Sequence, residues 1–311
     1  MKILITGGAG FIGSHIADAY IREGHSVVIL DNLSSGRIAN VHPDAKFVEG
    51  DIRDRDLIDR LFAEHRFDVV NHQAAQMDVR KSVDDPIFDA ETNILGSLNL
   101  LQASKKYSVH RFILASTGGA IYGEQEYFPA DELHPTNPES PYGVAKRTIE
   151  MYLHYFSVVH GIKYTAFRYS NVYGPRQDPH GEAGVVSIFS NALRSGKPCT
   201  IFGDGKQTRD YVFVADVVRA HIKALDLEAA SDTYNLSTAI ETTVSQLYAL
   251  IAESLGKNST EPRYSSARKG EVQRSVCSYQ KAFHHFGWQP EVSLRDGLQR
   301  TLSYFEATLS A

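Results

Sequence analysis

The stretch Thr6-Gly7-Gly8-Ala9-Gly10-Phe11-Ile12-Gly13 lies between an apolar run, Lys2 to Thr6, and a segment with helical spacing, Phe11 to Glu23. Its three spaced glycines let the backbone turn sharply and approach a pyrophosphate at the N-terminus of the following helix. Ser26 to Leu30 reads as a second buried strand, which completes a β-α-β unit. An ordinary glycine-rich turn is the alternative interpretation. The flanking strand and helix favour a dinucleotide site formed by Gly7, Gly10, Phe11, Ile12 and Gly13.

The alternation of strands and helices continues through the first half of the chain. Further strands are expected at Lys46–Glu49, Asp68–Asn71, Arg111–Ala115 and Lys163–Arg168, and further helices at Asp54–His65, Pro86–Tyr107 and Pro141–Val159. Because the strands are rich in Val and Ile and lack polar alternation, they predict a parallel sheet covered on both faces. The expected fold class is therefore α/β, a Rossmann-type doubly wound parallel sheet.

The alternation fails after Asn171, where the segment Gly174–Pro179 is rich in glycine and proline. We expect a Rossmann domain at residues 1–173 and a smaller α/β C-terminal lobe at residues 174–311, which would bind the substrate. Two later strands, near 210–214 and 233–236, can rejoin the main sheet.

Composition restricts the class of ligand. The 311 residues carry a formal charge of −5 and 42% hydrophobic residues, and the basic residues are scattered, which argues against a nucleic-acid or membrane partner. No apolar run has the length of a signal-peptide core or of a membrane span, so a soluble, cytoplasmic protein is expected. Cys199 and Cys277 are far apart and read as buried thiols. His284-His285 lacks metal-ligand spacing, and no metal is expected.

Other residues extend the candidate cofactor site. Asp31 ends the second strand, where a carboxylate can accept both hydroxyls of an adenosine ribose and repel a 2′-phosphate, so NAD is favoured over NADP. Arg37 keeps NADP open as an alternative. Asp51 and Ile52 would flank the adenine, although Asp51 could equally be a helix cap. Asn93 would lie inside a long helix, where a solvated polar residue is the alternative. The set is completed by Asn32, Ser35, Gly36, Ala74, Ala75 and Gln76.

A second motif supplies a candidate proton-handling pair. Ser140-Pro141 reads as a helix cap followed by proline at the first helical position, so Tyr142 and Lys146 lie four residues apart on one face. Lowering a phenol pKa from about 10 to about 7 requires roughly 4 kcal/mol. An ammonium about 4 Å away at an effective dielectric of 20 supplies about that much. The pair alone occurs by chance in many helices. Its presence in one chain with the glycine turn is what favours a catalytic role.

Two hydroxyls are expected near this pair. Ser116 and Thr117 follow the strand Arg111–Ala115, at the sheet edge where ligands bind in open α/β folds. Either hydroxyl could bridge a substrate oxygen and Tyr142. A hydroxyl that bonds to its own turn is the alternative.

Together these motifs resemble the extended short-chain dehydrogenase/reductase family, and within it the UDP-glucose 4-epimerases. The resemblance covers essentially the whole chain and is carried by Gly7-x-x-Gly10-x-x-Gly13, Ser116-Thr117, Tyr142-x-x-x-Lys146, Asn171–Arg176 and Arg209–Val212. It implies that Tyr142 removes the proton of the sugar 4-hydroxyl, that Lys146 binds the nicotinamide ribose, and that a 4-keto sugar forms and is reduced on its other face. Tightly held NAD is implied, with a UDP-sugar bound by Asn171, Val185, Arg209 and Arg268.

The sequence departs from the family at one catalytic position. Where many epimerases carry a serine, the alignment from Tyr122-Gly123 places Gly118, so Thr117 is the expected substitute and Ser116 the second choice. Gly118-Gly119-Ala120 offers none of the carboxylates of related dehydratases and decarboxylases. Asp178 would repel a uronate, so a neutral hexose is favoured.

The sugar and the reaction class keep alternatives. Ser275 stands where some relatives have a bulky aromatic, and a small residue there could admit the N-acetyl group of UDP-GlcNAc or UDP-GalNAc. Another NAD-dependent enzyme of the family, whether dehydrogenase, dehydratase or uronate epimerase, is the enzymatic alternative. A non-catalytic NAD-binding regulatory protein is the other. The resemblance also implies a homodimer packed through the helices Pro86–Tyr107 and Pro141–Val159.

Overall fold

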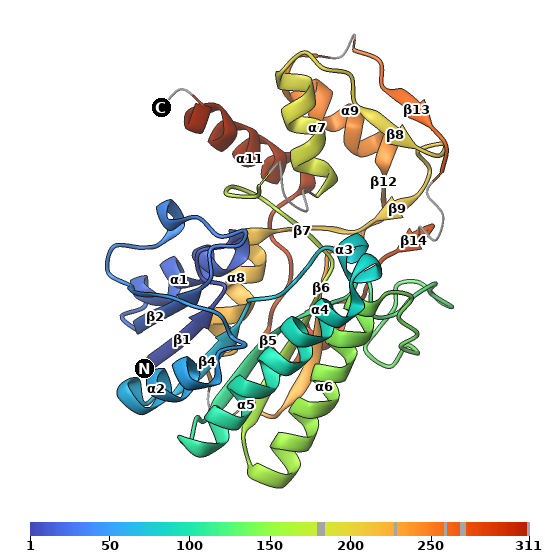
Figure 1. The fold of residues 1–311 in the computed structure, drawn as a ribbon. Helices are drawn as coiled ribbons and strands as arrows, with labels where there is room; N and C mark the ends of the chain where they lie inside the picture. The colour runs from blue at the N-terminus through green and yellow to red at the C-terminus, as the bar shows by residue number, and fades with distance from the viewer. Residues whose placement is uncertain (179–183, 227–228, 258–259, 268–271, 310–311) are drawn as a thin grey trace. The chain divides into compact units, whose positions relative to one another are not determined.

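The computed structural model describes residues 1–178, 184–226, 229–257, 260–267 and 272–309. The chain forms two compact units, each assembled from separate segments (Figure 1). The first unit comprises Met1–Ile121, Pro138–Arg168 and Val218–Tyr234, and the second comprises Tyr122–Asn137, Tyr169–Val217 and Asn235–Ala311. The expected domain boundary at residue 173 stays a prediction.

Strands and helices alternate through most of the chain. The strands are β1 (Lys2–Thr6), β2 (Ser26–Asp31), β3 (Lys46–Glu49), β4 (Val69–His72), β5 (Arg111–Thr117), β6 (Lys163–Tyr169), β7 (Asn171–Tyr173), β8 (Thr200–Phe202), β9 (Thr208–Arg209), β10 (Tyr211–Phe213), β11 (Asp232–Leu236), β12 (Thr242–Thr243), β13 (Arg263–Ser265) and β14 (Arg274–Ser275). The helices are α1 (Phe11–Arg22), η1 (Ile38–Asn40), α2 (Arg55–His65), α3 (Val79–Asp84), α4 (Pro86–Ala90), η2 (Glu91–Leu95), α5 (Gly96–Lys106), α6 (Pro141–His160), α7 (Val185–Arg194), α8 (Val214–Lys223), α9 (Val244–Ser254), α10 (Gln280–Phe286) and α11 (Leu294–Leu309).

A seven-stranded sheet forms the centre of the first unit, in the order β11-β6-β5-β4-β1-β2-β3. The pairs β1/β2, β1/β4, β2/β3 and β4/β5 are parallel. This order reverses direction between β1 and β4, which is the point where open α/β sheets bind ligands beyond the carboxyl ends of their strands. The Rossmann-type α/β prediction is confirmed. β11 lies at the edge of this sheet, whereas β10 pairs with β7.

Side chains on both faces of this sheet are buried. Leu4 of β1 packs in a cluster with apolar side chains of α2, α5 and α6, including Phe62, Leu100 and Leu153. Ile3 and Ile5 are also fully buried and point to the opposite face, since successive strand residues alternate. The apolar runs of β1, β2, β4 and β5 therefore reflect burial on both faces, as the sequence predicted.

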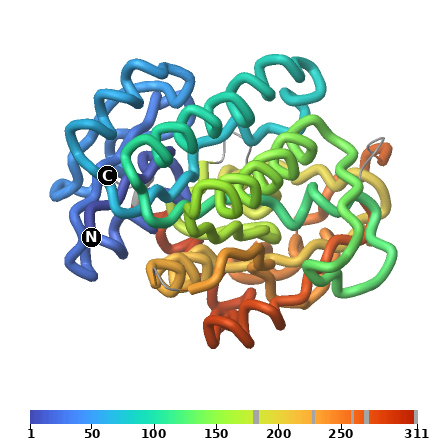
Figure 2. The backbone as a smooth tube through the Cα atoms, turned by 90° about the horizontal axis from the view of Figure 1, so that it is seen from below, coloured from blue at the N-terminus to red at the C-terminus, as the bar shows by residue number. Residues whose placement is uncertain are grey.

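The helix predicted at Pro86–Tyr107 is divided into α4, a π-helical turn (η2) and α5. Figures 1 and 2 show α5 running alongside α6 in the first unit. A π-helical turn widens the helix by one residue and frequently marks a functional site. In this chain it contains Asn93.

The second unit has its own small sheets and core. β12, β9 and β14 form one three-stranded sheet, and β8 pairs with β13. Trp288 is 1% exposed, and its indole Nε1 donates to the Asp216 carbonyl at 2.8 Å. Tyr122 donates to the Asn235 amide oxygen at 2.7 Å, which joins the segment 122–137 to the rest of this unit.

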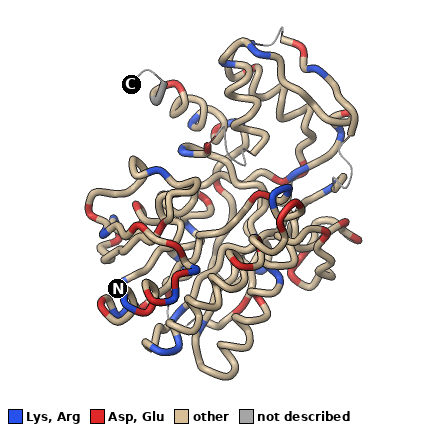
Figure 3. Tube along the Cα trace, viewed as in Figure 1, with Lys and Arg blue, Asp and Glu red and all other residues tan. Residues whose placement is uncertain are grey.

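Charged residues of both signs are interspersed along the trace (Figure 3). No helix in the described part of the chain is long and apolar enough to cross a membrane. Within the same residues, no group of His, Cys, Asp and Glu side chains has the arrangement of a metal site.

Candidate active site

The glycine turn between β1 and α1 has no room for a side chain at Gly7 or at Gly13. Gly7 adopts a φ of +70°, and a Cβ added there would lie 2.6 Å from the backbone nitrogen of Ala74. A Cβ at Gly13 would collide with the Gly7 carbonyl oxygen. Gly10 is the N-cap of α1 and no side chain caps this end, so the first backbone N–H groups, at Phe11 and Ile12, are placed to bind an anion.

Asp31 lies at the carboxyl end of β2 and is 7% exposed. Its two oxygens accept backbone N–H groups of Ala9 at 3.0 Å and Leu33 at 2.8 Å. Burial raises the pKa of this carboxyl, and the two hydrogen bonds oppose that shift. Because each carboxylate oxygen has a further lone pair, Asp31 can still accept two ribose hydroxyls. Gly36 packs closely against Asp31, and a Cβ at this position would lie 2.8 Å from Oδ1 of Asp31.

Asp51 forms a bidentate ion pair with Arg53, at 3.0 and 2.9 Å. This pair lowers the pKa of Asp51 to about 2. Asn32 also donates to Asp51 at 3.0 Å, which brings two predicted cofactor residues together. The N-cap of α2 is Asp54, which accepts from Leu57, so the alternative role of Asp51 as a helix cap is wrong. Of two further predicted residues, Ile52 is buried and Ser35 is exposed.

A buried chain of hydrogen bonds fixes the loop after β4. The Ser97 hydroxyl donates to the Asn93 carbonyl, so its oxygen accepts from His72 Nε2 at 2.8 Å. His72 Nδ1 therefore accepts from the Thr6 hydroxyl at 2.7 Å, and Thr6 Oγ1 accepts from the backbone N–H of Ala74 at 3.3 Å. Burial, with a smaller effect of Lys146, lowers the pKa of His72 to about 3 and keeps it neutral. Sequence reasoning missed Thr6, His72 and Ser97.

Asn93 holds the other end of the same loop. Its amide accepts from the Gln76 backbone nitrogen at 2.9 Å and donates to the Gln76 carbonyl at 2.8 Å and to Asp89 at 2.9 Å. Asn93 is 1% exposed, so its interpretation as a solvated polar residue is wrong. The predicted loop residues Ala74, Ala75 and Gln76 are thus fixed at both ends.

Tyr142 and Lys146 lie on successive turns at the start of α6. Ser140 caps this helix by accepting from the Gly143 N–H at 3.2 Å, and Pro141 follows at the first helical position, as predicted. Lys146 is 2% exposed, and its ammonium donates to the Ala115 carbonyl at 2.9 Å. Its Nζ lies 5.7 Å from the centroid of the Tyr142 ring.

The charge of Lys146 is balanced between opposing effects. Burial lowers the pKa of the ammonium to about 8, while the carboxylates of Asp89 and Glu150 oppose the shift. At neutral pH Lys146 therefore remains mostly protonated and presents a poorly hydrated positive charge beside a phenol. This is the arrangement that favours the anionic form of a tyrosine.

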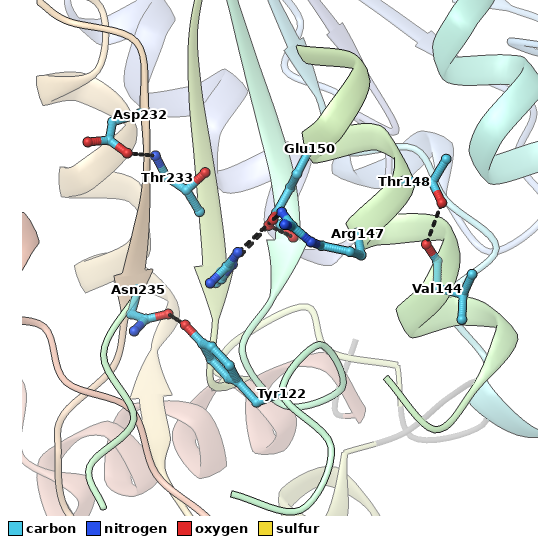
Figure 4. Close-up of polar contacts among 10 residues, drawn as sticks. Tyr122, Val144, Arg147, Thr148, Glu150, Asp232, Thr233 and Asn235 are labelled. Carbon is cyan, nitrogen blue, oxygen red and sulfur yellow. Dashed lines mark hydrogen bonds and ion pairs between the residues drawn. The ribbon is translucent and has the colours of Figure 1, made fainter. Parts of the chain in front are cut away.

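The two hydroxyls at the end of β5 have different partners. Ser116 donates to Oε1 of Glu150 at 2.7 Å, whereas Thr117 Oγ1 accepts the backbone N–H of Ala120 at 3.2 Å. Thr117 thus does bond to its own turn, and among the described residues it does so only as an acceptor, so its proton can still be donated. Glu150 also contacts Arg147, and Figure 4 shows these two side chains reaching toward each other.

The predicted substrate residues belong to the second unit. Arg209 and Ser275 are paired directly across β9 and β14. Asn171 starts β7 and donates through its side chain to the Asp210 carbonyl at 3.2 Å, and Val185 starts α7. Arg268 lies outside the described residues. Asp210, which is completely buried, accepts from Thr238 and Ala239 and so fixes the strand end beside Arg209.

Known proteins resemble this chain over its whole length. A family model described as the NAD dependent epimerase/dehydratase family matches residues 3–237. A UDP-glucose 4-epimerase from Mycolicibacterium smegmatis is 43% identical over 98% of both chains. The crystal structure of a Thermotoga maritima UDP-glucose 4-epimerase with UDP-glucose has a TM-score of 0.97 and 50% identity, covering 99% of this chain and 100% of that chain. The Thermus thermophilus UDP-glucose 4-epimerase in complex with NAD has a TM-score of 0.92 and 44% identity, covering 98% of this chain and 99% of that chain.

Proposed function

Because the chain belongs to the NAD dependent epimerase/dehydratase family, we propose that it is an NAD-dependent UDP-hexose 4-epimerase that acts through a transient 4-keto sugar. The observation that carries this proposal is the buried ammonium of Lys146 beside the Tyr142 ring, in the same unit as the glycine turn. The first feature handles a proton and the second accommodates a dinucleotide, so together they support oxidation and reduction at an alcohol carbon.

The residues present fit NAD. The turn at Gly7 and Gly13 excludes side chains, the uncapped N-terminus of α1 can bind the pyrophosphate, and Asp31 has lone pairs for two ribose hydroxyls. When bound, NAD supplies a two-electron acceptor that returns those electrons within the same cycle. We assign the adenine side to the Asn32–Asp51 contact and the neighbouring Ile52, with Ser35 and Gly36 in the adjoining loop. The loop Ala74–Gln76, fixed by Asn93, lines the remaining side.

The protein supplies proton transfer and charge. Tyr142 takes the proton from the sugar 4-hydroxyl as the carbonyl forms, and returns it when the opposite face is reduced. Lys146 stabilises the phenolate because its charge is desolvated and held in place by the Ala115 carbonyl. Thr117 donates a hydrogen bond to the same substrate oxygen. Gly118 and Gly119 leave that position free of carboxylates, which disfavours elimination chemistry at a neighbouring carbon.

The nucleotide part of the substrate is assigned to the second unit. We propose that Arg209 binds the diphosphate, since a guanidinium matches phosphate oxygens bidentately. Asn171 and Val185 belong to the same proposed site, and Arg268 is included on the family resemblance.

The sugar is proposed to be glucose and galactose, with the N-acetylated pair as a second candidate. Ser275 supports the second candidate because it lies beside Arg209 and is a small residue at 5% exposure. Turnover of UDP-glucose and UDP-GlcNAc should be compared in the native chain and in Ser275→Tyr. A Ser275→Tyr variant with full activity on the N-acetylated sugar would show that this position does not limit the pocket.

We further propose a homodimer formed through α4 to α6 of the first unit. Apolar side chains are exposed there, with Ile87 and Val158 71% exposed and Met151 60% exposed. A surface hollow of about 460 Å³ between α4 and α6 adds unfilled apolar surface. Light scattering should give twice the chain mass for the native protein and a lower mass for Met151→Glu. A cytoplasmic location remains part of the proposal.

The function is tested by incubating the purified chain with UDP-glucose or with UDP-galactose and separating the products. The proposal expects one equilibrium mixture from both directions, with no NADH released. Accumulation of free NADH would indicate a dehydrogenase. Bound NAD without turnover of any UDP-sugar would indicate a regulatory protein.

A further inference from the structure

Two side chains of α6, on the same helical face as Tyr142, bind consecutive residues of β5. Tyr142, Lys146 and Glu150 follow one another at intervals of four residues, so they lie on one helical face. Lys146 donates to the Ala115 carbonyl at 2.9 Å, and Glu150 accepts from the Ser116 hydroxyl at 2.7 Å. The next residue of β5 is Thr117.

Glu150 is a buried carboxylate with a fixed orientation. Its side chain is 2% exposed, and it forms a bidentate pair with Arg168, whose side chain is 4% exposed. Arg168 Nε donates to Oε1 at 3.0 Å and Nη2 donates to Oε2 at 2.7 Å. Because both oxygens accept from a guanidinium, the group is ionised and can only accept from Ser116.

A hydroxyl has one proton, and this fact separates the two candidates at the end of β5. The proton of Ser116 is directed to a buried carboxylate, in a charge-assisted bond about twice as strong as a neutral one. Within the part of the chain that the structure describes, Thr117 uses only a lone pair, which accepts from the backbone N–H of Ala120. Its proton can therefore be donated to a substrate oxygen.

We propose that Glu150 is a positioning residue that selects Thr117 as the hydroxyl assisting Tyr142, by binding the proton of Ser116. This inference rests on the proposed epimerase function and deepens it. Glu150 itself contacts neither substrate nor cofactor in this account. The bidentate contact with Arg168 fixes its orientation, and Arg147 contributes a further cation at 3.3 Å.

The experiment compares the effect of Thr117→Ala on kcat in two backgrounds. In the native chain, Thr117→Ala should lower kcat by about 100-fold, the usual effect of losing one preorganised donor. The pair substitution Glu150→Leu with Arg168→Met removes both buried charges together, which is often tolerated when volume is kept. In that background the Ser116 proton is released, so Thr117→Ala should lower kcat only about tenfold. Adding Ser116→Ala there should restore the full loss.

The matched control is Thr148→Ala. Thr148 lies on another side of the same helix and donates to the Val144 carbonyl at 2.9 Å (Figure 4), so this variant should keep native kcat. If the charge-free background lacks a cooperative thermal transition, Glu150→Gln replaces it, since the amide nitrogen can face Ser116 and release its proton.

The outcomes separate the two claims. An unchanged penalty for Thr117→Ala in the folded background would overturn the role of Glu150 while leaving the epimerase function intact. A loss for Ser116→Ala in the native chain as large as that for Thr117→Ala would overturn it as well. A native chain that converts no UDP-hexose would overturn both.

Discussion

Replacing Lys146 by Met should move the pH profile of the reaction by an amount that follows from the structure. Nζ lies 5.7 Å from the centroid of the Tyr142 ring, and unit charges at that separation interact by about 3 kcal/mol at an effective dielectric of 20. Since one pKa unit corresponds to about 1.36 kcal/mol, this equals about 2 units. The acid limb of kcat/KM should therefore rise by about 2 pH units in Lys146→Met, and activity at pH 7 should fall about 100-fold.

The native profile has a second expected feature. The pKa of Lys146 is lowered to about 8, so the supporting charge is present below that pH and lost above it. Native kcat/KM should then decline as the pH rises through about 8, while Lys146→Met should gain activity in the same range. The profiles are measured from pH 5 to 10 by separating UDP-glucose from UDP-galactose.

A matched control and a refuting result complete this test. Lys163→Met removes an exposed lysine from β6 and should leave the profile unchanged. Retained NAD and a native melting temperature confirm that Lys146→Met is folded. An acid limb at the native position, with only KM altered, would mean that Lys146 binds without tuning Tyr142.

Three further results are expected. Gly7→Ala should lose bound NAD and several degrees of melting temperature, because its Cβ would lie 2.6 Å from Ala74 N. The control is Gly24→Ala, which is also at positive φ but has open space around it, so its melting temperature should fall less. Asp31→Asn should weaken NADH binding by about 10- to 100-fold, the effect of losing charged hydrogen bonds. It should also reduce the ratio of the affinities for NADH and NADPH, as measured by fluorescence titration. Equal NADH affinities in the native chain and the variant would contradict the ribose assignment. Burial lowers the pKa of His72 and His221 to about 3, so only the unfolded state binds their protons below pH 6.5, and together they should lower the free energy of unfolding by about 4 kcal/mol between pH 7 and pH 5. Asp210, whose pKa is raised by burial to about 6, is protonated in the folded state at pH 5 and should offset about 1 kcal/mol of this loss. In urea denaturation His72→Gln should remove about half of the histidine contribution.

Patterns local in sequence predicted the elements that carry much of the candidate site. The glycine spacing, the Ser140-Pro141 helix start and the interval between Tyr142 and Lys146 each depend on neighbouring residues, and the structure has the elements they require. Fully apolar strands likewise predicted the parallel sheet, because burial on both faces removes polar alternation.

Features that depend on distant pairings were not predictable. Thr6 and His72 are 66 residues apart, and only the β1/β4 register brings them into hydrogen-bond contact. The burial of Asn93 could not be predicted, because periodicity does not reveal a π-helical turn. Asp51 and Asp54 are equally good caps by residue type, and only backbone conformation distinguishes them. Glu150 could have been noticed, since it continues the four-residue interval from Lys146.

The central claim is that the C4 hydrogen leaves the sugar with its electrons, is held within the protein and returns to the same carbon. UDP-glucose carrying deuterium at C4 tests this most directly, with the UDP-galactose product examined by mass spectrometry and NMR after reaction in ordinary water. The account predicts that deuterium is retained at C4 of the product. Replacement of that deuterium by solvent hydrogen would contradict it, because the reaction would then proceed by removal of a proton from carbon.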